Sequence, residues 1–219
     1  MYKINDLFDL NHTIAAALFN GREYPWEVLD SIKPFILELG RSLPEDEFDN
    51  PSEGVWIARD ATVYPSAYIG APCIIDHGAE IRHCAFIRGS AIVGKNCVVG
   101  NSVELKNVLL FDNVQVPHYN YVGDSILGYR SHMGAGSITS NVKSDRTLVV
   151  VKEAGEHIET GRKKFGAMLG DGVEVGCNSV LNPGTVVGRN TNIYPVSMVR
   201  GVIPANSIYK ADDEIVPKQ

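Results

Sequence analysis

Large aliphatic residues recur at every sixth position in two long runs of the chain. The first run is Ile57, Val63, Ile69, Ile75, Ile81, Ile87, Val93, Val99 and Leu105. The second run is Leu169, Val175, Leu181, Val187, Ile193 and Val199. A period of six matches neither the 3.6-residue period of a helix nor the alternation of one long strand. It is typical of a solenoid whose coil has flat sides of six residues, with one aliphatic side chain pointing inward from each side.

A smaller residue follows four positions after most aliphatic residues of the first run, where it fills the space near a corner. This set is Ala61, Ala67, Cys73, Ala79, Ala85, Ala91, Cys97 and Val103. Gly, Asn and Asp supply the unusual backbone angles of the turns. The pattern predicts an all-β fold, a three-sided parallel β-helix of hexapeptide repeats over residues 51–205. We interpret Cys73 and Cys97 as small buried hydrophobic residues, because equivalent positions hold Ala.

Residues 1–50 lack the six-residue pattern. Apolar residues at helical spacing between Trp26 and Leu39 predict a helix there, which Pro34 should kink or divide. We expect residues 1–50 to form a small N-terminal helical cap over the open end of the solenoid. Without such a cap, that end would expose unpaired strand edges.

The pattern also changes phase between Leu105 and about Leu127, and it is interrupted at residues 142–166. Within this insertion, LVVVK and EHIET flank a turn-like Glu-Ala-Gly, which predicts a protruding hairpin. Insertions in repeat proteins map to loops on one face, which is often the binding face. Residues 206–219 are expected to form a C-terminal tail.

Composition narrows the classes of partner. The net charge is −6 and no long basic run is present, which argues against nucleic acid or an anionic membrane surface. No stretch of about 18 apolar residues is present, and the first 21 residues do not resemble a signal peptide. The four cysteines match no zinc-binding spacing. We therefore expect a cytoplasmic protein that uses no metal.

Two cationic residues occupy equivalent positions of neighbouring coils. Three sides of six residues make a coil of 18, so residues 18 apart stack about 4.8 Å from each other. Arg88 and Lys106 are 18 apart, and each follows an inward aliphatic residue, so both emerge at the same corner. Two interpretations stay open: the side chains splay into water, or they clamp an anion such as phosphate.

His118 lies twelve residues after Lys106, in the segment PHYNYVGD, where the repeat changes phase. It is either a structural histidine or a general base. In the second case Glu104 could accept one ring N–H, which would fix the tautomer and leave the other nitrogen free to take a proton.

Neutral polar groups accompany these charged residues. Tyr121 and Asn141 add hydrogen-bonding side chains close to His118 in the sequence. The segment GAGSITSN offers exposed backbone N–H groups at residues 134–136, and such groups can face a developing oxyanion. The stretch from residue 103 to 141 is therefore the candidate site.

The order VELKN, PHYNYVGD and GAGSITSN resembles one family. It is similar to the acetyltransferase domain of the bifunctional glucosamine-1-phosphate N-acetyltransferase/N-acetylglucosamine-1-phosphate uridyltransferase enzymes. The resemblance covers about residues 55–205 and is most specific over residues 88–141. It implies a left-handed β-helix, a homotrimer with active sites between subunits, and acetyl-coenzyme A as the co-substrate.

The resemblance also implies roles for individual residues. His118 matches the general base, Glu104 the carboxylate that orients it, and Ala135 the backbone N–H that steadies the thioester oxyanion. The substrate-binding matches are Arg88 and Lys106 for the sugar phosphate, Tyr121 and Asn141 for the sugar, and Lys164 as a further sugar-site lysine. Cys177 and Pro195 fall where small residues line the acetyl-coenzyme A site.

The leading hypothesis is acetyl transfer from acetyl-coenzyme A to the amine of a phosphorylated amino sugar, such as glucosamine 1-phosphate. Uridyltransferase activity is not expected, because residues 1–50 are too few for that domain. His132 and Val142 depart from the family pattern and leave room for a longer acyl group or a nucleotide-linked sugar. A non-catalytic sugar-phosphate-binding or oligomerisation module is the third hypothesis. A zinc hydrolyase is a weaker fourth, because the histidine spacings do not match.

Overall fold

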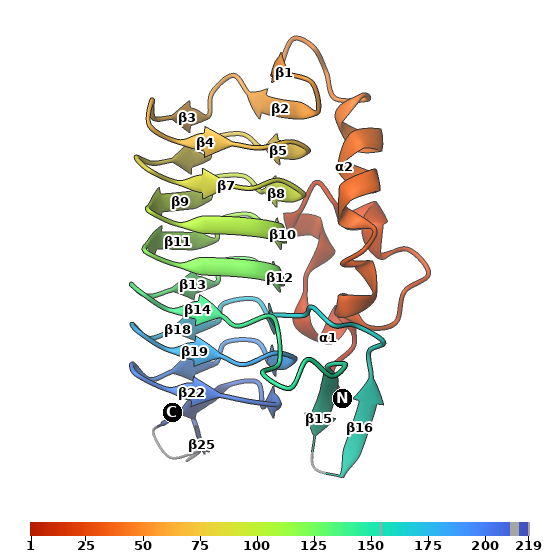
Figure 1. The fold of residues 1–219 in the computed structure, drawn as a ribbon, viewed down its shortest axis with the longest axis vertical. Helices are drawn as coiled ribbons and strands as arrows, with labels where there is room; N and C mark the ends of the chain where they lie inside the picture. The colour runs from red at the N-terminus through yellow and green to blue at the C-terminus, as the bar shows by residue number, and fades with distance from the viewer. Residues whose placement is uncertain (154, 211–214, 219) are drawn as a thin grey trace.

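The computed structural model describes residues 1–153, 155–210 and 215–218. It is an upright stack of coils, with the N-terminal coils at the top of Figure 1 and the C-terminal coils at the bottom. Strands of successive coils pair in parallel on each side, as β5 (Cys73–Ile75) does with β2 (Val55–Ala58). The predicted all-β, three-sided parallel solenoid is thus confirmed, and its left-handed sense stays a prediction.

Three stacks of short strands form the sides of the solenoid. Side one contains β4 (Tyr68–Ile69), β7 (Phe86–Ile87), β14 (Ile138–Thr139), β19 (Val180–Leu181) and β22 (Met198–Val199). Side two contains β2 (Val55–Ala58), β5 (Cys73–Ile75), β8 (Ala91–Val93), β17 (Ala167–Leu169), β20 (Thr185–Val187) and β23 (Val202–Ile203). β10 (Glu104–Leu110) and β12 (Tyr121–Leu127) run through a corner and belong to sides one and two.

Side three faces the other two. It contains β3 (Thr62–Val63), β6 (Glu80–Ile81), β9 (Val98–Asn101), β11 (Gln115–His118), β13 (His132–Met133), β18 (Glu174–Val175), β21 (Asn192–Ile193) and β24 (Ser207–Tyr209). The inward aliphatic residues predicted from the six-residue period are fully buried from Ile75 through Leu105. Val63 is 36% exposed, because it belongs to the first, terminal coil.

The predicted phase change is a shortening of the coil. On side one, Leu105 aligns with Ile87, which is the interval of three full sides that the six-residue period requires. After the next corner, Val108 aligns with Ala91, so the interval between coils has become one position shorter. This loss of one position lets β10 continue through the corner as a single strand, and β12 stacks on it over the same length.

The N-terminal helices lie along side two and do not cover the end of the solenoid, which corrects the expected position of the cap (Figure 1). They are α1 (Ile4–Leu7), the 3₁₀ helices η1 (Leu10–His12), η2 (Ala16–Phe19) and η3 (Pro25–Val28), and α2 (Ile32–Gly40). The physical reason is an outward apolar row on side two. Its members Ile74, Ile92, Leu109 and Ile126 are completely buried.

The predicted helix is divided, as Pro34 indicated: η3 ends at Val28 and α2 starts at Ile32, with Pro34 in the first turn of α2. Proline is tolerated there because the first amides of a helix have no intrahelical acceptor. Among the described residues, no helix combines the length and apolar character needed to cross a bilayer.

Antiparallel strands close both ends of the solenoid. β1 (Phe48–Ser52) pairs with β2 at the first coil, and β25 (Ile215–Pro217) pairs with β24 at the last. The repeat therefore continues to Tyr209, past the expected boundary at residue 205. Residues 211–214 and 219 of the expected tail lie outside the described residues.

The insertion carries an antiparallel pair, β15 (Val150–Glu153) and β16 (Glu156–Glu159). It leaves the solenoid after Asn141 and returns at Phe165, whose backbone N–H donates to the Asn141 carbonyl. The hairpin lies below the N-terminal helices in Figure 1. Trp26 and Phe165 pack with ring centroids 5.7 Å apart, so the base of the insertion contacts the helical segment.

Candidate active site

One corner, between sides three and one, carries four of the predicted residues; we call it the His118 corner. On six successive coils, one residue of this corner adopts a left-handed backbone conformation with φ between 52° and 72°. These residues are Cys84, Ser102, Tyr119, Gly136, Asn178 and Val196. The residues directly before them form one column down the solenoid: His83, Asn101, His118, Ala135, Cys177 and Pro195.

Backbone hydrogen bonds hold this column together. The Gly136 N–H donates to the His118 carbonyl at 3.0 Å. On the next coils, the Asn178 N–H donates to the Ala135 carbonyl and the Val196 N–H to the Cys177 carbonyl, both at 2.9 Å. The candidate base, the candidate oxyanion donor and the two candidate coenzyme-site residues therefore stack in order along a single edge.

Asn120 fixes the backbone around His118. Asn120 is 2% exposed, and its Oδ1 accepts from the His118 N–H at 3.1 Å. Its Nδ2 donates to the Gly134 carbonyl at 2.8 Å and to the Ser137 carbonyl at 3.1 Å. A buried side chain with this many partners ties His118 to the turn that contains Ala135.

The reactive groups at this corner are accessible. The His118 side chain is exposed, and its ring has no hydrogen-bond partner among the described residues. Within the same residues, the Ala135 N–H also lacks an acceptor. A free imidazole and a free backbone donor on adjacent coils are the groups that proton removal and oxyanion stabilisation require.

Side one carries the predicted cations. Arg88 and Lys106 stack at the same position of neighbouring coils, as the spacing of 18 predicted: the Arg88 N–H donates to the Leu105 carbonyl. Each cation already has an acidic partner. Arg88 Nη1 lies 2.8 Å from Glu104 Oε1, and Lys106 Nζ lies 2.9 Å from both oxygens of Asp124.

Glu104 is therefore engaged with Arg88, and its pairing with His118 stays a prediction. The hydrogen bond from Arg88 to Glu104 raises the pKa of the Arg88 guanidinium. Glu104 and His118 flank the same corner on adjacent coils. Glu104 aligns with Tyr121, which follows His118 in the sequence, and His118 aligns with Asn101, which precedes Glu104. An anion that engages Arg88 would free the Glu104 carboxylate for the imidazole.

The next corner, between sides one and two, is where the insertion leaves the solenoid; we call it the insertion corner. Its centre is Asp124, which is 4% exposed. Besides Lys106, the Asp124 carboxylate accepts from Asn107 Nδ2 at 2.9 Å and from Asn141 Nδ2 at 2.6 Å. Four charged hydrogen bonds satisfy this buried carboxylate.

Tyr121 belongs to the same network. Asn141 Nδ2 lies 3.2 Å from its hydroxyl oxygen. Burial, followed by the negative charge of Asp124, raises the pKa of Tyr121, so the phenol stays protonated and can donate to a ligand. Gly123 aligns with Lys106 on the neighbouring coil. Because glycine has no side chain, the Tyr121 hydroxyl occupies the space where a Cβ would lie.

A cavity of about 530 Å³ lies at the insertion corner, on the side of the insertion nearer the N-terminal coils. We call it the upper cavity. Five cations line it: Lys33, Lys106, Arg162, Lys163 and Lys164. Two carboxylates also line it, Asp124 and Asp30, and Asp30 forms an ion pair with Arg162. The lining thus carries three positive charges in excess, which favours an anionic ligand.

Sequence reasoning missed three of these residues. Asp124 and Asn120 lie in the quoted segment PHYNYVGD, but periodicity alone does not distinguish a buried polar corner residue from a surface one. Lys33 belongs to α2, which was expected over the end of the solenoid. The outward apolar row on side two was the available signal, because a solenoid side that is apolar on both faces must be covered.

Three other histidines have contacts of their own, and one of them, His83, belongs to the column of the His118 corner. His77 contacts Asp60, His83 contacts the Ser66 hydroxyl, and His132 contacts Glu174. Among the residues that the structure describes, no three histidine, cysteine or acidic side chains gather as a metal site would require.

Comparison with known proteins finds relatives whose names describe sugar-1-phosphate enzymes. Residues 69–154 match the family model described as the GMPPB C-terminal domain. A bifunctional sugar-1-phosphate nucleotidylyltransferase/acetyltransferase of Sulfurisphaera tokodaii is 31% identical over 189 residues, covering 85% of this chain and 47% of that protein. The bifunctional protein GlmU of Methanococcus maripaludis is 32% identical over 204 residues, covering 92% and 49%.

A solved structure shows a weaker likeness. The acetyltransferase domain of PglB from Neisseria gonorrhoeae, in complex with acetyl coenzyme A, aligns with a TM-score of 0.35 and 18% identity, covering 90% of this chain and 80% of that one. The chain spans about half the length of the curated relatives it matches. By these sequence matches, the chain belongs to the family of the acetyltransferase domain of bifunctional sugar-1-phosphate nucleotidylyltransferase/acetyltransferases.

Proposed function

We propose that this protein transfers the acetyl group of acetyl-coenzyme A to the amine of a phosphorylated amino sugar, with glucosamine 1-phosphate as the first candidate acceptor. The observation that carries the proposal is the column of the His118 corner. It stacks His118, Ala135, Cys177 and Pro195 beside a side that presents Arg88 and other polar groups. The relatives' names, which include acetyltransferase, support the same reaction.

The proposed step is a nucleophilic acyl substitution. The acceptor amine attacks the thioester carbonyl carbon, and His118 takes a proton from the nitrogen as the C–N bond forms. The Ala135 N–H donates to the oxyanion of the tetrahedral intermediate. The C–S bond then breaks, and the coenzyme A thiolate leaves and takes up a proton. The exposed Cys177 and Pro195 corner provides the path along which the coenzyme would lie.

The acceptor's phosphate belongs with the cations of side one and the upper cavity. Arg88 would exchange Glu104 for the phosphate, which releases Glu104 to orient the His118 ring. Lys106 stays held by Asp124, so the further positive charge comes from Lys164 and its neighbours in the upper cavity. Tyr121 and Asn141, which already contact each other, are placed to bind the sugar hydroxyls.

We further propose a homotrimer in which side one faces a second copy. Side one exposes large apolar side chains that a monomer would leave in water: Tyr68 is 60% exposed, Phe86 43% and Met198 54%. Tyr68 and Phe86 pack against each other with ring centroids 5.5 Å apart. Sedimentation equilibrium tests this assembly, and a Phe86→Glu variant should shift the mass toward the monomer.

The test of function is a coenzyme A thiol-release assay with acetyl-coenzyme A against a panel of amino-sugar phosphates. A general base is worth about 10²–10⁴-fold, so His118→Ala should lower kcat by that order with little change in KM for the acceptor. The matched control is His77→Ala, a partly exposed histidine outside the His118 corner. Equal activity of wild type and His118→Ala, or no thiol release with any acceptor, would overturn the proposal.

A nucleotide-linked amino sugar is the second candidate acceptor. The upper cavity has five cations and a volume of about 530 Å³, which is more than one phosphate requires. If the acceptor panel includes nucleotide-linked amino sugars, the ratio of kcat/KM values decides between the two. We propose that uridyl transfer is absent, and incubation with UTP and an acetylated sugar phosphate should release no pyrophosphate.

A further inference from the structure

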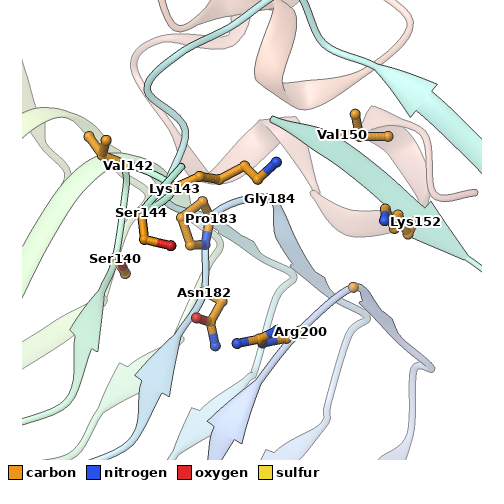
Figure 2. Close-up of a pocket in the computed structure, with 11 residues that line it drawn as sticks. Ser140, Val142, Lys143, Ser144, Val150, Lys152, Asn182, Pro183, Gly184 and Arg200 are labelled. Atoms are coloured by element: carbon orange, nitrogen blue, oxygen red, sulfur yellow. The ribbon is translucent and has the colours of Figure 1, made fainter. Parts of the chain in front are cut away.

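A second cavity lies on the opposite side of the insertion from the upper cavity. Its volume is about 460 Å³, and we call it the lower cavity. Figure 2 shows its polar lining. Ser140 directly follows β14, Lys143 and Ser144 come from the start of the insertion, Lys152 from β15, and Asn182 and Arg200 from the next two coils of the solenoid. The residues that line the two cavities do not overlap.

The lower cavity is strongly cationic. Three basic side chains line it and no described lining residue is acidic. Among the described residues, Arg200 donates only to the Met198 sulfur, at 3.7 Å, and Lys152 forms no ion pair. Lys143 Nζ lies 3.3 Å from Asp145, a carboxylate of the insertion that does not line the cavity. At least two cations therefore face this space without compensating negative charge.

The remaining lining is suited to a ring. Val142, Val150 and Pro183 give the cavity an apolar wall, and Val142 is 44% exposed. The Ser140, Ser144 and Asn182 side chains add neutral hydrogen-bonding groups close to the cations. A cavity of this volume is in the range of sites for small organic ligands and is much larger than one inorganic phosphate requires.

We propose that the lower cavity binds an organic phosphate, a phosphate or diphosphate ester that carries a ring. The Arg200 guanidinium offers paired donors to phosphate oxygens, and Lys143 and Lys152 add point charges. The ring packs on the wall of Val142, Val150 and Pro183. This site goes beyond the proposed acetyl transfer, because it lies outside the His118 corner and shares no residue with the upper cavity.

Occupation of the lower cavity would join two parts of the molecule. Lys152 and Val150 belong to the hairpin, whereas Asn182 and Arg200 belong to the solenoid. A bound phosphate contacts both the hairpin and the solenoid, so the hairpin separates from the solenoid less often. Arg162–Lys164, at the other end of the same insertion, line the upper cavity, where the acceptor's phosphate is proposed to bind. A ligand in the lower cavity is therefore placed to change the affinity for the acceptor.

The test is isothermal titration calorimetry of the full chain with uridine 5′-diphosphate as the probe, and with inorganic pyrophosphate as the ring-free comparison. Because the upper cavity also attracts anions, the measurement is made in a Lys33→Gln/Lys164→Gln background. We expect one remaining site in that background. Adding Arg200→Gln and Lys152→Gln should raise its Kd about tenfold for each cation removed.

Arg146→Gln is the matched control. Arg146 is an exposed cation of the same insertion that lines neither cavity, so its loss removes one positive charge from the insertion without changing Kd. Hydrogen exchange gives a second readout: the probe should slow exchange of the β15 and β16 amides in the same background. An unchanged Kd after Arg200→Gln/Lys152→Gln, or weakening by Arg146→Gln to the same degree, would overturn the assignment.

Discussion

The His118 corner and the insertion corner bound the same side of the solenoid, yet they are built differently. Both corners contain residues with left-handed backbone conformation, such as Ser102 and Tyr119 at the His118 corner and Asn107 and Asp124 at the insertion corner. At the His118 corner, the residue recurs at the same point of six coils, and backbone hydrogen bonds link coils on both sides of the insertion. At the insertion corner, the coil shortens by one position and a buried carboxylate gathers four hydrogen bonds. The insertion leaves this corner after Asn141 and returns to it at Phe165.

This difference separates two tasks. The regular corner holds exposed groups, the His118 ring and the Ala135 N–H, at fixed spacing on a rigid edge. The irregular corner builds concave, cationic spaces, because cavities form where the insertion, and at the upper cavity also Lys33 of α2, meets the solenoid. Reactive geometry therefore comes from repetition, and ligand-binding volume comes from its interruption.

The largest effect is expected from breaking the regular corner with Gly100→Ala. An added Cβ would lie 1.6 Å from the carbonyl oxygen and 2.1 Å from the carbonyl carbon of Pro117, the residue before His118. Backbone atoms cannot move aside, so we expect a loss of more than about 4 kcal/mol in the free energy of unfolding. Urea denaturation followed by circular dichroism measures it.

The control for that substitution is Gly21→Ala, where an added Cβ meets nothing within 4 Å and only the positive φ of 72° opposes it. Its cost should be about 1–2 kcal/mol. If Gly100→Ala unfolds at the same urea concentration as wild type, the close stacking of the two coils at this corner is wrong.

The two corners also differ in how well the sequence predicts them. Spacing alone placed Ile75, Ile87 and Leu105 in the core, and stacked Arg88 on Lys106, because a coil of three six-residue sides fixes those neighbours. Residue type and the change of phase singled out His118, motif resemblance added Ala135, and the structure stacks the two on neighbouring coils. The partners of the cations, Glu104 and Asp124, and the Lys33 contribution depend on tertiary packing. Periodicity contains no information on them.

The insertion corner is tested by Asp124→Asn. The substitution keeps the size and the tolerance for a positive φ, but removes the charge that Lys106 and Asn141 contact. We expect the free energy of unfolding to fall by about 2 kcal/mol, since hydrogen bonds to charged groups contribute about 1.5–3 kcal/mol and Lys106 regains some hydration. Thermal unfolding monitored by calorimetry gives the value.

Asp145→Asn provides the comparison, because Asp145 is an exposed carboxylate of the insertion whose partner is the half-buried Lys143. Its replacement should change stability much less than Asp124→Asn does, because an exposed ion pair is screened by solvent. Equal losses for Asp124→Asn and Asp145→Asn would mean that the buried network adds nothing to the insertion corner.

A smaller effect, of opposite sign, is expected from Val196→Asn. Val196 has a φ of 60°, which is strained for a β-branched residue, and it is 77% exposed, so little burial is lost. Asn tolerates this conformation, as Asn178 does on the neighbouring coil. We expect a gain of about 1 kcal/mol. The reverse change, Asn178→Val, should destabilise by a similar amount, and a Val196→Asn protein no more stable than wild type would contradict the strain.

Asp76, at the third corner, shows what a buried carboxylate does without the compensation that Asp124 receives. Asp76 is fully buried, its Oδ2 has no partner within the described residues, and burial raises its pKa despite the nearby Lys95 and His77. The folded state then binds the proton more tightly than the unfolded state. Stability from this group is greatest below the unfolded pKa of about 3.9 and falls as the pH rises through the raised value.

Asp76→Asn removes this dependence, so the stability of the variant relative to wild type should rise with pH across that window. Asp145 gives the opposite slope. Its pKa is lowered, chiefly by the hydrogen bond from the Thr147 N–H, so its contribution is present above the unfolded pKa and is lost as the pH falls. Chemical denaturation from about pH 3.5 to 7 compares the two variants. Parallel curves for Asp76→Asn and wild type would show that Asp76 titrates alike in the folded and unfolded states. Burial at the third corner would then carry no free-energy cost for the charged carboxylate.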